Sequence, residues 1–266
     1  MKSRKKEGKE GNGIFGEFFL VGIFSILSLL ALSVFISATP TGPSTLTSIS
    51  NSSLGTTPAL SFNLSGGNIG VFNLTANVQD PRWKGFVGNA SGSFTLSDAL
   101  GSTLYNWNLA SITGKLYATR YNSNVNWAGI QCANLTTLVN EDNSMNLTNL
   151  TAPSDNLTQT FNCTSASCVG TNAPFYVGAV YITANTCPTL FTYTNTTGQS
   201  LPQNSFYQET ALYAPSNVLV YETPIEPSNT IGYNGQNYNF QMIVPENGTI
   251  GFNSSTAYYL YVELGS

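Results

Sequence analysis

The sequence has no histidine, and only 8% of its 266 residues are charged. Without histidine, neither a Ser-His-Asp nor a Cys-His catalytic arrangement can form. From Ala38 onward there are four basic residues and ten acidic ones. This negative balance argues against nucleic-acid binding, which needs a basic face. What replaces charge is a dense supply of Asn, Ser and Thr, together with 14 Tyr and 15 Phe.

Motifs that carry chemistry are also lacking. The chain contains no G-x-S-x-G, no P-loop and no D-[ST]-G signature, which argues against the common hydrolase and nucleotide-binding classes. A glycosidase needs only two carboxyl groups about 5 to 9.5 Å apart, so scattered carboxylates leave that class open. With no histidine and no C-x-x-C, zinc is not expected. The acidic run 141–144 favours a helix end over a calcium site because it lacks EF-hand spacing. We expect no enzyme activity, no catalytic residue, no cofactor and no metal.

The amino-terminal region indicates the compartment. Residues 1–13 hold five of the nine basic residues, and residues 18–36 carry no charge. An apolar run of this length can span a bilayer, and the basic tail is expected to stay in the cytoplasm. We predict a signal-anchor over residues 14–38 in a single-pass cell-membrane protein whose remainder is extracellular. Two alternatives stay open: a signal peptide cleaved near Ala38, and a pilin-like segment with Glu17 just inside the helix.

The next segment, residues 39–58, is rich in Ser, Thr, Pro and Gly and carries no charge. Such a composition is typical of a stalk or linker. The extracellular domain is therefore expected over residues 59–266.

Twelve N-x-[ST] triplets lie in the expected extracellular part. An Asn- and Thr-rich chain produces some by chance, but in an exported chain each is a candidate glycan acceptor. The acceptors are Asn51, Asn63, Asn73, Asn89, Asn134, Asn146, Asn149, Asn156, Asn162, Asn195, Asn247 and Asn253. Covalent glycans are thus expected partners, on side chains that face water.

Strand-like periodicity dominates the folded part. Between positions 60 and 74 apolar and polar residues alternate on both sides of Gly66-Gly67, which predicts two half-buried strands joined as a hairpin. Further strands are predicted over 114–120, 175–183, 190–194, 217–223, 237–244 and 257–264, and a short helix is expected within 133–147. Short strands separated by turns are typical of an all-β, β-sandwich-like fold, as one domain or two closely packed ones.

The four cysteines all follow the apolar segment. An even number outside the cytosol predicts two disulfides, for which three pairings exist. The short spacing favours Cys163 with Cys168, which leaves Cys132 with Cys187.

Trp83, Trp107 and Trp127 lie within 45 residues, beside the four basic residues of the exported part. Aromatic side chains stack on sugars, so the three form a candidate sugar-binding platform. Burial in the core is the competing interpretation, and it is the one we favour.

Residues 83–107, 114–120 and the segment around VPENG at 244–248 resemble a group of exported archaeal surface proteins of unassigned activity. They share a W-x-G-x-x-G-N-x-[ST]-G opening, which here begins at Trp83. The resemblance implies a tethered or secreted envelope protein and assigns no catalytic residues. The sequence therefore predicts a membrane-anchored, N-glycosylated surface protein with a structural or adhesive role, in contact with envelope proteins or copies of itself. The alternatives are a subunit of a pilin-like or strand-exchanged filament, and a carbohydrate-binding module or carbohydrate-active enzyme.

Overall fold

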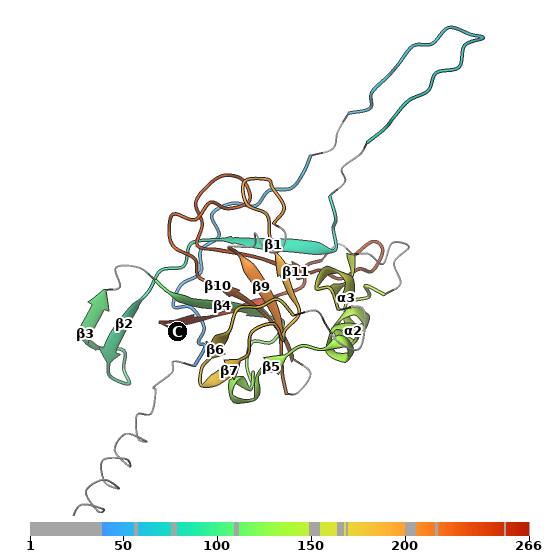
Figure 1. The fold of residues 1–266 in the computed structure, drawn as a ribbon. Helices are drawn as coiled ribbons and strands as arrows, with labels where there is room; N and C mark the ends of the chain where they lie inside the picture. Colours follow the sequence, from blue (N-terminus) through green and yellow to red (C-terminus); the bar gives the residue numbers. More distant parts are fainter. Residues whose placement is uncertain are drawn as a thin grey trace, which may run out of the picture. The chain divides into compact units, whose positions relative to one another are not determined.

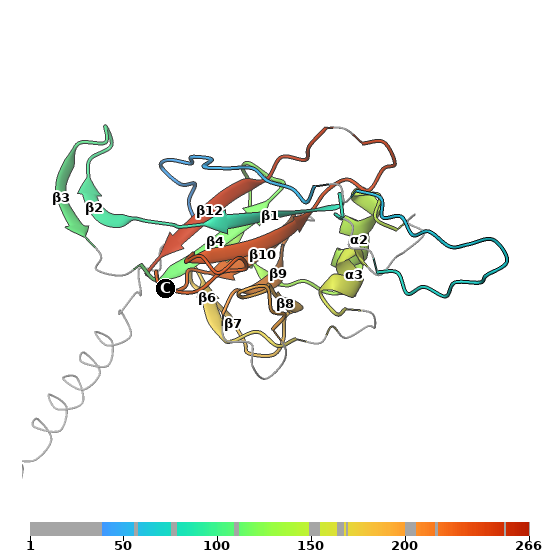
Figure 2. The ribbon, with the colours of Figure 1, turned by 90° about the horizontal axis from the view of Figure 1, so that it is seen from above.

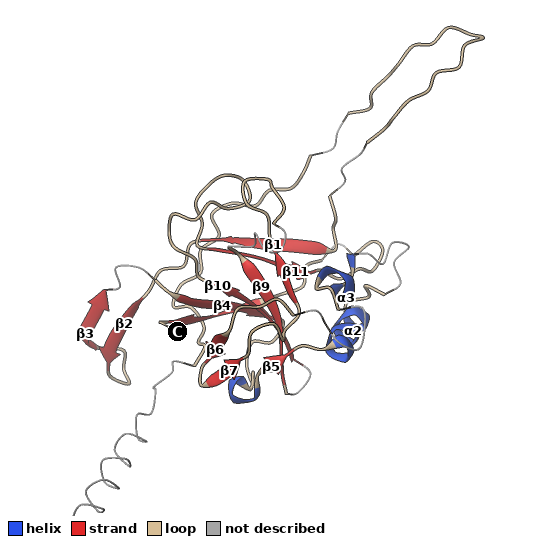
Figure 3. Ribbon diagram, viewed as in Figure 1, coloured by secondary structure: helices blue, strands red, loops and turns tan. Residues whose placement is uncertain are grey.

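The computed structural model describes residues 39–55, 58–75, 79–108, 112–148, 155–163, 168, 170–199, 206–215, 218–252 and 254–265. Most of the regular structure is antiparallel β-sheet, with few helices (Figures 1 and 3). The all-β prediction is confirmed.

A six-stranded antiparallel sheet forms the centre of the fold. Its strands follow the order β12-β4-β10-β9-β5, and β8 also pairs with β9. The strands are β4 (Gly114–Thr119), β5 (Gln131–Cys132), β8 (Thr189–Phe191), β9 (Gln208–Ala214), β10 (Val218–Pro224) and β12 (Tyr259–Leu264). Side chains alternate between the two faces of a strand, so a strand covered on both faces reads as a continuous buried run. Strand β10 is such a case, because all its residues except Pro224 are buried.

One face of the central sheet is covered by β1 (Trp83–Gly88) paired with β11 (Phe240–Pro245), and by helices α2 (Leu135–Ser144) and α3 (Leu157–Thr160). These elements enclose the larger of two apolar clusters. Its buried members include Leu116, Ala118, Ala211, Leu219, Tyr221, Met242, Val244, Leu138, Leu157 and Phe161.

The opposite face is covered by a hairpin of β6 (Phe175–Val177) and β7 (Val180–Ile182) and by the short helix η1 (Trp127–Gly129). The second apolar cluster lies there, with Tyr117, Leu212, Val218, Val220, Val177, Ile182 and Ile130 among its buried members. The single strand predicted over 175–183 is wrong. Gly178 has φ +55°, which glycine adopts readily, and the chain reverses there to form the β6–β7 hairpin.

Side chains from the central sheet bind the edge of β11 that does not face β1. The carboxyl group of Glu209, on β9, accepts the N–H of Ile243 at 2.8 Å. The hydroxyl of Thr223, on β10, donates to the carbonyl of Gln241 at 3.1 Å. Both polar side chains are fully buried. They therefore join the covering layer to the central sheet through hydrogen bonds as well as apolar packing.

The first described residues lie against the domain. Thr41 pairs with Val262 on the outer edge of β12 through two backbone hydrogen bonds of 3.0 and 2.7 Å, and Pro40 is buried. The segment expected to form a stalk is thus attached to the sheet within its first three residues. The predicted signal-anchor, residues 14–38, lies outside the described residues. Among the residues after position 38 that the structure describes, no helix is long and apolar enough to cross a bilayer.

The predicted hairpin over 60–74 differs from the structure. A turn forms at Gly66-Gly67, but the flanking residues form no strand, and the rings of Phe62 and Phe72 lie 5.0 Å apart. The predicted inward-facing side chains are exposed instead, with Leu60 at 94% and Phe62 at 70%. The alternation of apolar and polar residues gives a hairpin one apolar face, but it does not provide another element to cover that face. A lone hairpin is only marginally stable in water.

We predict that Glu209→Ala lowers the free energy of unfolding by about 2 to 4 kcal/mol, because it leaves the buried Ile243 N–H without an acceptor and opens a cavity. Burial raises the pKa of Glu209 well above its ordinary value. The matched variant Glu209→Gln keeps an acceptor and resembles the protonated acid, so it should cost less than about 1 kcal/mol. Denaturant unfolding of the full-length protein in detergent measures both. Equal losses in the two variants would contradict this role for the hydrogen bond.

Candidate functional site

The most exposed apolar surface on a regular element belongs to a separate hairpin, β2 (Ser93–Ser97) paired with β3 (Thr103–Asn108). The pairing sets Phe94 opposite Trp107 and Leu96 opposite Tyr105, so all four side chains share one face. Each is between 41% and 57% exposed. Figure 1 shows this hairpin apart from the central sheet. We call these four side chains the aromatic face.

The turn of this hairpin is well defined. The carboxylate of Asp98 accepts the N–H groups of Leu100 and Ser102 at 2.9 and 2.8 Å, and Gly101 has φ +85°. A tight turn of this kind holds the two strands in register. The aromatic face is therefore presented by an ordered hairpin, whose tip exposes Leu100 at 93% beside the carboxylate of Asp98.

The β6–β7 hairpin carries a smaller exposed aromatic pair. Tyr176 and Tyr181 lie opposite each other, with ring centroids 5.0 Å apart. Both are 53% exposed, whereas Val177 and Ile182 on the other face of the hairpin are buried. The two hairpins thus both turn ring systems toward solvent.

The structure does not bring the three tryptophans together. Trp83 packs against the cluster under β11 and donates its indole N–H to the carbonyl of Asp155 at 2.7 Å. Trp127 packs against the cluster on the opposite face of the central sheet, with its ring about 5 Å from those of Tyr117 and Tyr261. Trp107 lies on the aromatic face. They form no shared platform, because two of them serve the core.

The sequon asparagines lie at the surface where the structure describes them. Asn51, Asn63, Asn73, Asn89, Asn134, Asn146, Asn162 and Asn195 are exposed, and Asn156 and Asn247 are half-buried. Asn149 and Asn253 lie outside the described residues. Asn134 and Asn156 cap helices, since their amide oxygens accept the N–H groups of Thr137 and Gln159 at 3.0 and 2.9 Å. A glycan attaches through the amide nitrogen, so both caps are compatible with occupancy.

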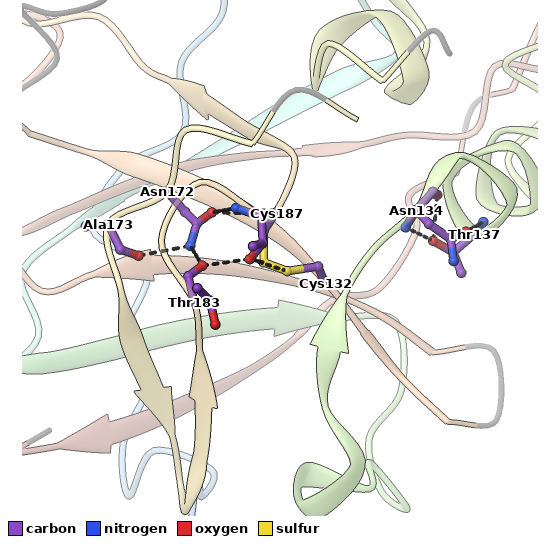
Figure 4. The surroundings of a disulfide bond; sticks show 8 residues. Cys132, Asn134, Thr137, Asn172, Ala173, Thr183 and Cys187 are labelled. Carbon is purple, nitrogen blue, oxygen red and sulfur yellow. Dashed lines mark hydrogen bonds between the residues drawn. A yellow bond between two sulfur atoms is a disulfide. The ribbon is translucent and has the colours of Figure 1, made fainter. Parts of the chain in front are cut away.

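The structure contains the two disulfides that the spacing favoured, and all four cysteines are paired. Cys132–Cys187 joins the edge strand β5 to the loop before β8 (Figure 4). The buried amide of Asn172 fixes that loop: its oxygen accepts the N–H groups of Thr186 and Cys187, both at 2.8 Å. This bridge closes 55 residues of chain, and such a long closure strongly restricts the unfolded state.

Two glutamates of the central sheet, Glu222 and Glu263, lie close together but are buried. Glu222 and Glu263 share a face of the central sheet with Lys115 and Tyr117. The phenol of Tyr117 donates to Glu263 at 2.7 Å, and the other oxygen of Glu263 accepts the N–H of Gly178 in the β6–β7 turn at 3.0 Å. Both glutamates are at most 2% exposed. The β6–β7 hairpin closes this cluster, so a sugar polymer has no access to it.

The acidic run at the end of α2 is occupied by protein contacts. Glu141 forms a two-point ion pair with Arg120, at 2.7 and 2.8 Å, beside a depression of about 490 Å³. Hydrogen bonding to Glu141 raises the pKa of Arg120, so the guanidinium stays charged. Asp142 accepts the N–H groups of Leu157 and Thr158 at the start of α3. Across the described ranges, no group of three or more His, Cys, Asp or Glu is placed to hold a metal ion.

Comparisons with protein-family models, with curated proteins and with solved structures found no match to this chain. The resemblance to exported archaeal surface proteins therefore stays an expectation from the sequence.

The closed glutamate cluster predicts a pH dependence of stability. Burial raises the pKa of Glu222 to about 7, against an ordinary value of 4.5, despite the opposing effect of Lys115. Because the pKa of Glu222 is higher in the folded state, protonation of Glu222 stabilises the fold. This contribution to the free energy of unfolding is complete below about pH 4.5 and is lost as the pH rises through 7. The loss attributable to Glu222 amounts to about 3 kcal/mol. Glu222→Gln should therefore flatten the fall in unfolding free energy between pH 5 and 8. Identical slopes for variant and wild type would exclude this account of Glu222.

Proposed function

We propose that the chain is a membrane-anchored, N-glycosylated cell-surface protein whose β-sandwich-like domain has a structural or adhesive role in the cell envelope. The observation that carries the proposal is the pairing of all four cysteines. Disulfides persist in oxidising compartments and are rare in the cytosol. The proposed route out of the cytosol is the apolar segment 18–36, which follows a basic tail.

The arrangement of polar groups supports a role in binding or structure rather than catalysis. The buried carboxylates are used inside the fold: Glu209 binds β11, Asp142 binds α3, and Glu263 binds the β6–β7 turn. The surface instead carries exposed asparagines and exposed apolar side chains. Glycans on such asparagines would keep a domain of low charge soluble.

A second candidate function is favoured by the exposed segment 59–75. It is a subunit of a strand-exchanged filament, in which this segment completes the sheet of a neighbouring copy. Seven apolar side chains of the segment are exposed, namely Leu60, Phe62, Leu64, Ile69, Val71, Phe72 and Leu74. The pilin-like form of this candidate requires processing between Gly13 and Ile14, whereas the signal-anchor keeps residues 1–38.

Mass spectrometry of the native protein separates these possibilities, because it reports the amino terminus, the disulfides and the sugars together. We predict an uncleaved terminus, the bridges Cys132–Cys187 and Cys163–Cys168, and glycans on exposed sequons. A mature terminus at Ile14 would favour the pilin-like filament. Free thiols and bare asparagines in a soluble cytosolic protein would contradict the proposed function.

The sequon at Asn134 allows a matched pair of variants. Thr136→Ala removes the acceptor triplet but leaves the Asn134 cap, so it should delete one glycan mass while preserving the stability of α2. Asn134→Gln should delete the same mass and also cost about 1 kcal/mol, because the cap is lost. Intact mass and thermal unfolding of both variants give the comparison. An unchanged mass in both would show that this sequon is unoccupied.

A further inference from the structure

We propose that the aromatic face of the β2–β3 hairpin and the tyrosine pair of the β6–β7 hairpin rest in the headgroup layer of the bilayer that anchors the chain. This inference rests on the proposed membrane anchoring and adds an interaction surface to it. The occupant of the exposed rings is thus the host membrane rather than a protein partner.

The first step is the meeting of three chain segments at the last residues of β12. Residues 39–41, where the polypeptide enters the domain, are held there because Thr41 pairs with Val262. The β6–β7 turn is held there by Gly178, whose N–H binds Glu263. The base of β2 lies there as well, because the ring of Phe94 lies against Gly265, 2.7 Å from where a Cβ on that residue would be.

Further contacts make this junction compact. A Cβ built on Gly178 would lie 4.0 Å from the Cα of Thr39, and Gly92 lies against the side chain of Leu264. Figures 1 and 2 both show the β2–β3 hairpin and the carboxy terminus on the same side of the central sheet, away from α2 and α3. Residues 39–41 and both aromatic hairpins therefore occupy one end of the domain.

The second step is the reach of the chain. Two residues, Ser37 and Ala38, separate Ile36, the last residue of the apolar run, from Thr39. Fully extended, the three Cα–Cα steps from Ile36 to Thr39 span at most about 11 Å. The headgroup layer on each side of a bilayer is about 5 to 8 Å thick. If residues 18–36 span the hydrocarbon, Thr39 and the hairpins packed around it must lie at or next to the headgroups.

The third step is the chemistry of the exposed rings. Trp and Tyr are enriched at membrane interfaces because they combine an apolar ring with a polar group. Trp107, Tyr105, Tyr176 and Tyr181 are of this type, and Phe94 and Leu96 add apolar area. The rings lie on the aromatic face and not at the tip, which carries Asp98 and the exposed Leu100. The hairpin is therefore expected to lie along the surface with its aromatic face toward the lipid.

The positions of the sequons agree with this orientation. No N-x-[ST] triplet occurs in residues 90–133 or 163–194, which contain both hairpins. A face that lies on a bilayer has no room for glycans, whereas a face in open solvent does. The nearest acceptor, Asn89, is at the end of β1, next to Asn239.

The experiment uses the full-length protein reconstituted in phosphatidylcholine vesicles, with and without a nitroxide on the lipid headgroup. The contribution of Trp107 to the fluorescence is the difference between wild type and Trp107→Phe, since Trp83 and Trp127 remain in the variant. We expect the nitroxide lipid to remove about half or more of the Trp107 emission, as for a ring in the headgroup layer. Flotation of the same vesicles reports anchoring independently.

A second pair of variants, in the Trp107→Phe background, keeps the test valid if that hairpin tolerates no change. Tyr176→Trp places a reporter on β6, and Tyr259→Trp places one at the opposite end of β12. Tyr259 is 40% exposed, and five residues of strand put it about 17 Å from Leu264. The nitroxide lipid should quench the added emission in Tyr176→Trp and leave that in Tyr259→Trp largely unchanged.

The other outcomes overturn the inference in distinguishable ways. If the protein floats with the vesicles but neither Trp107 nor the β6 reporter is quenched, the anchoring stands and the lipid contact is wrong. If the protein does not float, both the proposed function and this inference fail. If Trp107 is shielded from acrylamide and from nitroxide lipid while the protein sediments as a dimer, a second copy covers the aromatic face instead of the membrane.

Discussion

The backbone pairing between Thr41 and Val262 fixes where the polypeptide enters the domain. It joins residues 39–41 to the outer edge of β12, at the end of the central sheet where two aromatic hairpins also meet. Edge strands need such a partner, because an open edge pairs with other chains.

Scarcity of charge shapes the interior of the domain as well as its surface. Inside the fold, a few carboxyl, amide and hydroxyl side chains connect the layers through hydrogen bonds. Glu209 and Thr223 bind β11 to the central sheet, Glu263 binds the β6–β7 turn, and Asn172 holds the loop at Cys187. A buried polar group is costly unless it is hydrogen-bonded, so these connections favour one arrangement of the covering layers over others.

The sequence allowed prediction of the strands that carry continuous apolar runs, and of α2. It did not indicate β9, because Glu209 and Thr210 interrupt the apolar pattern there, although both are buried in the fold. It was wrong over residues 60–74, where alternation describes a possible strand but not the partner that a strand needs. Cysteine spacing favoured the observed pairs, whereas the separation of Trp83, Trp107 and Trp127 depends on long-range packing. The aromatic face required the strand register, which places Phe94 beside Trp107.

We propose that the domain lies directly on the bilayer, with no stalk between the two. Electron cryomicroscopy of the full-length protein in a lipid nanodisc measures the gap between the headgroups and the central sheet. We predict that density of the domain begins at the headgroup layer, with the β2–β3 hairpin against it. Twenty extended residues could separate the two by about 65 Å. A clear gap of several tens of ångströms, with residues 39–58 bridging it, would contradict this account.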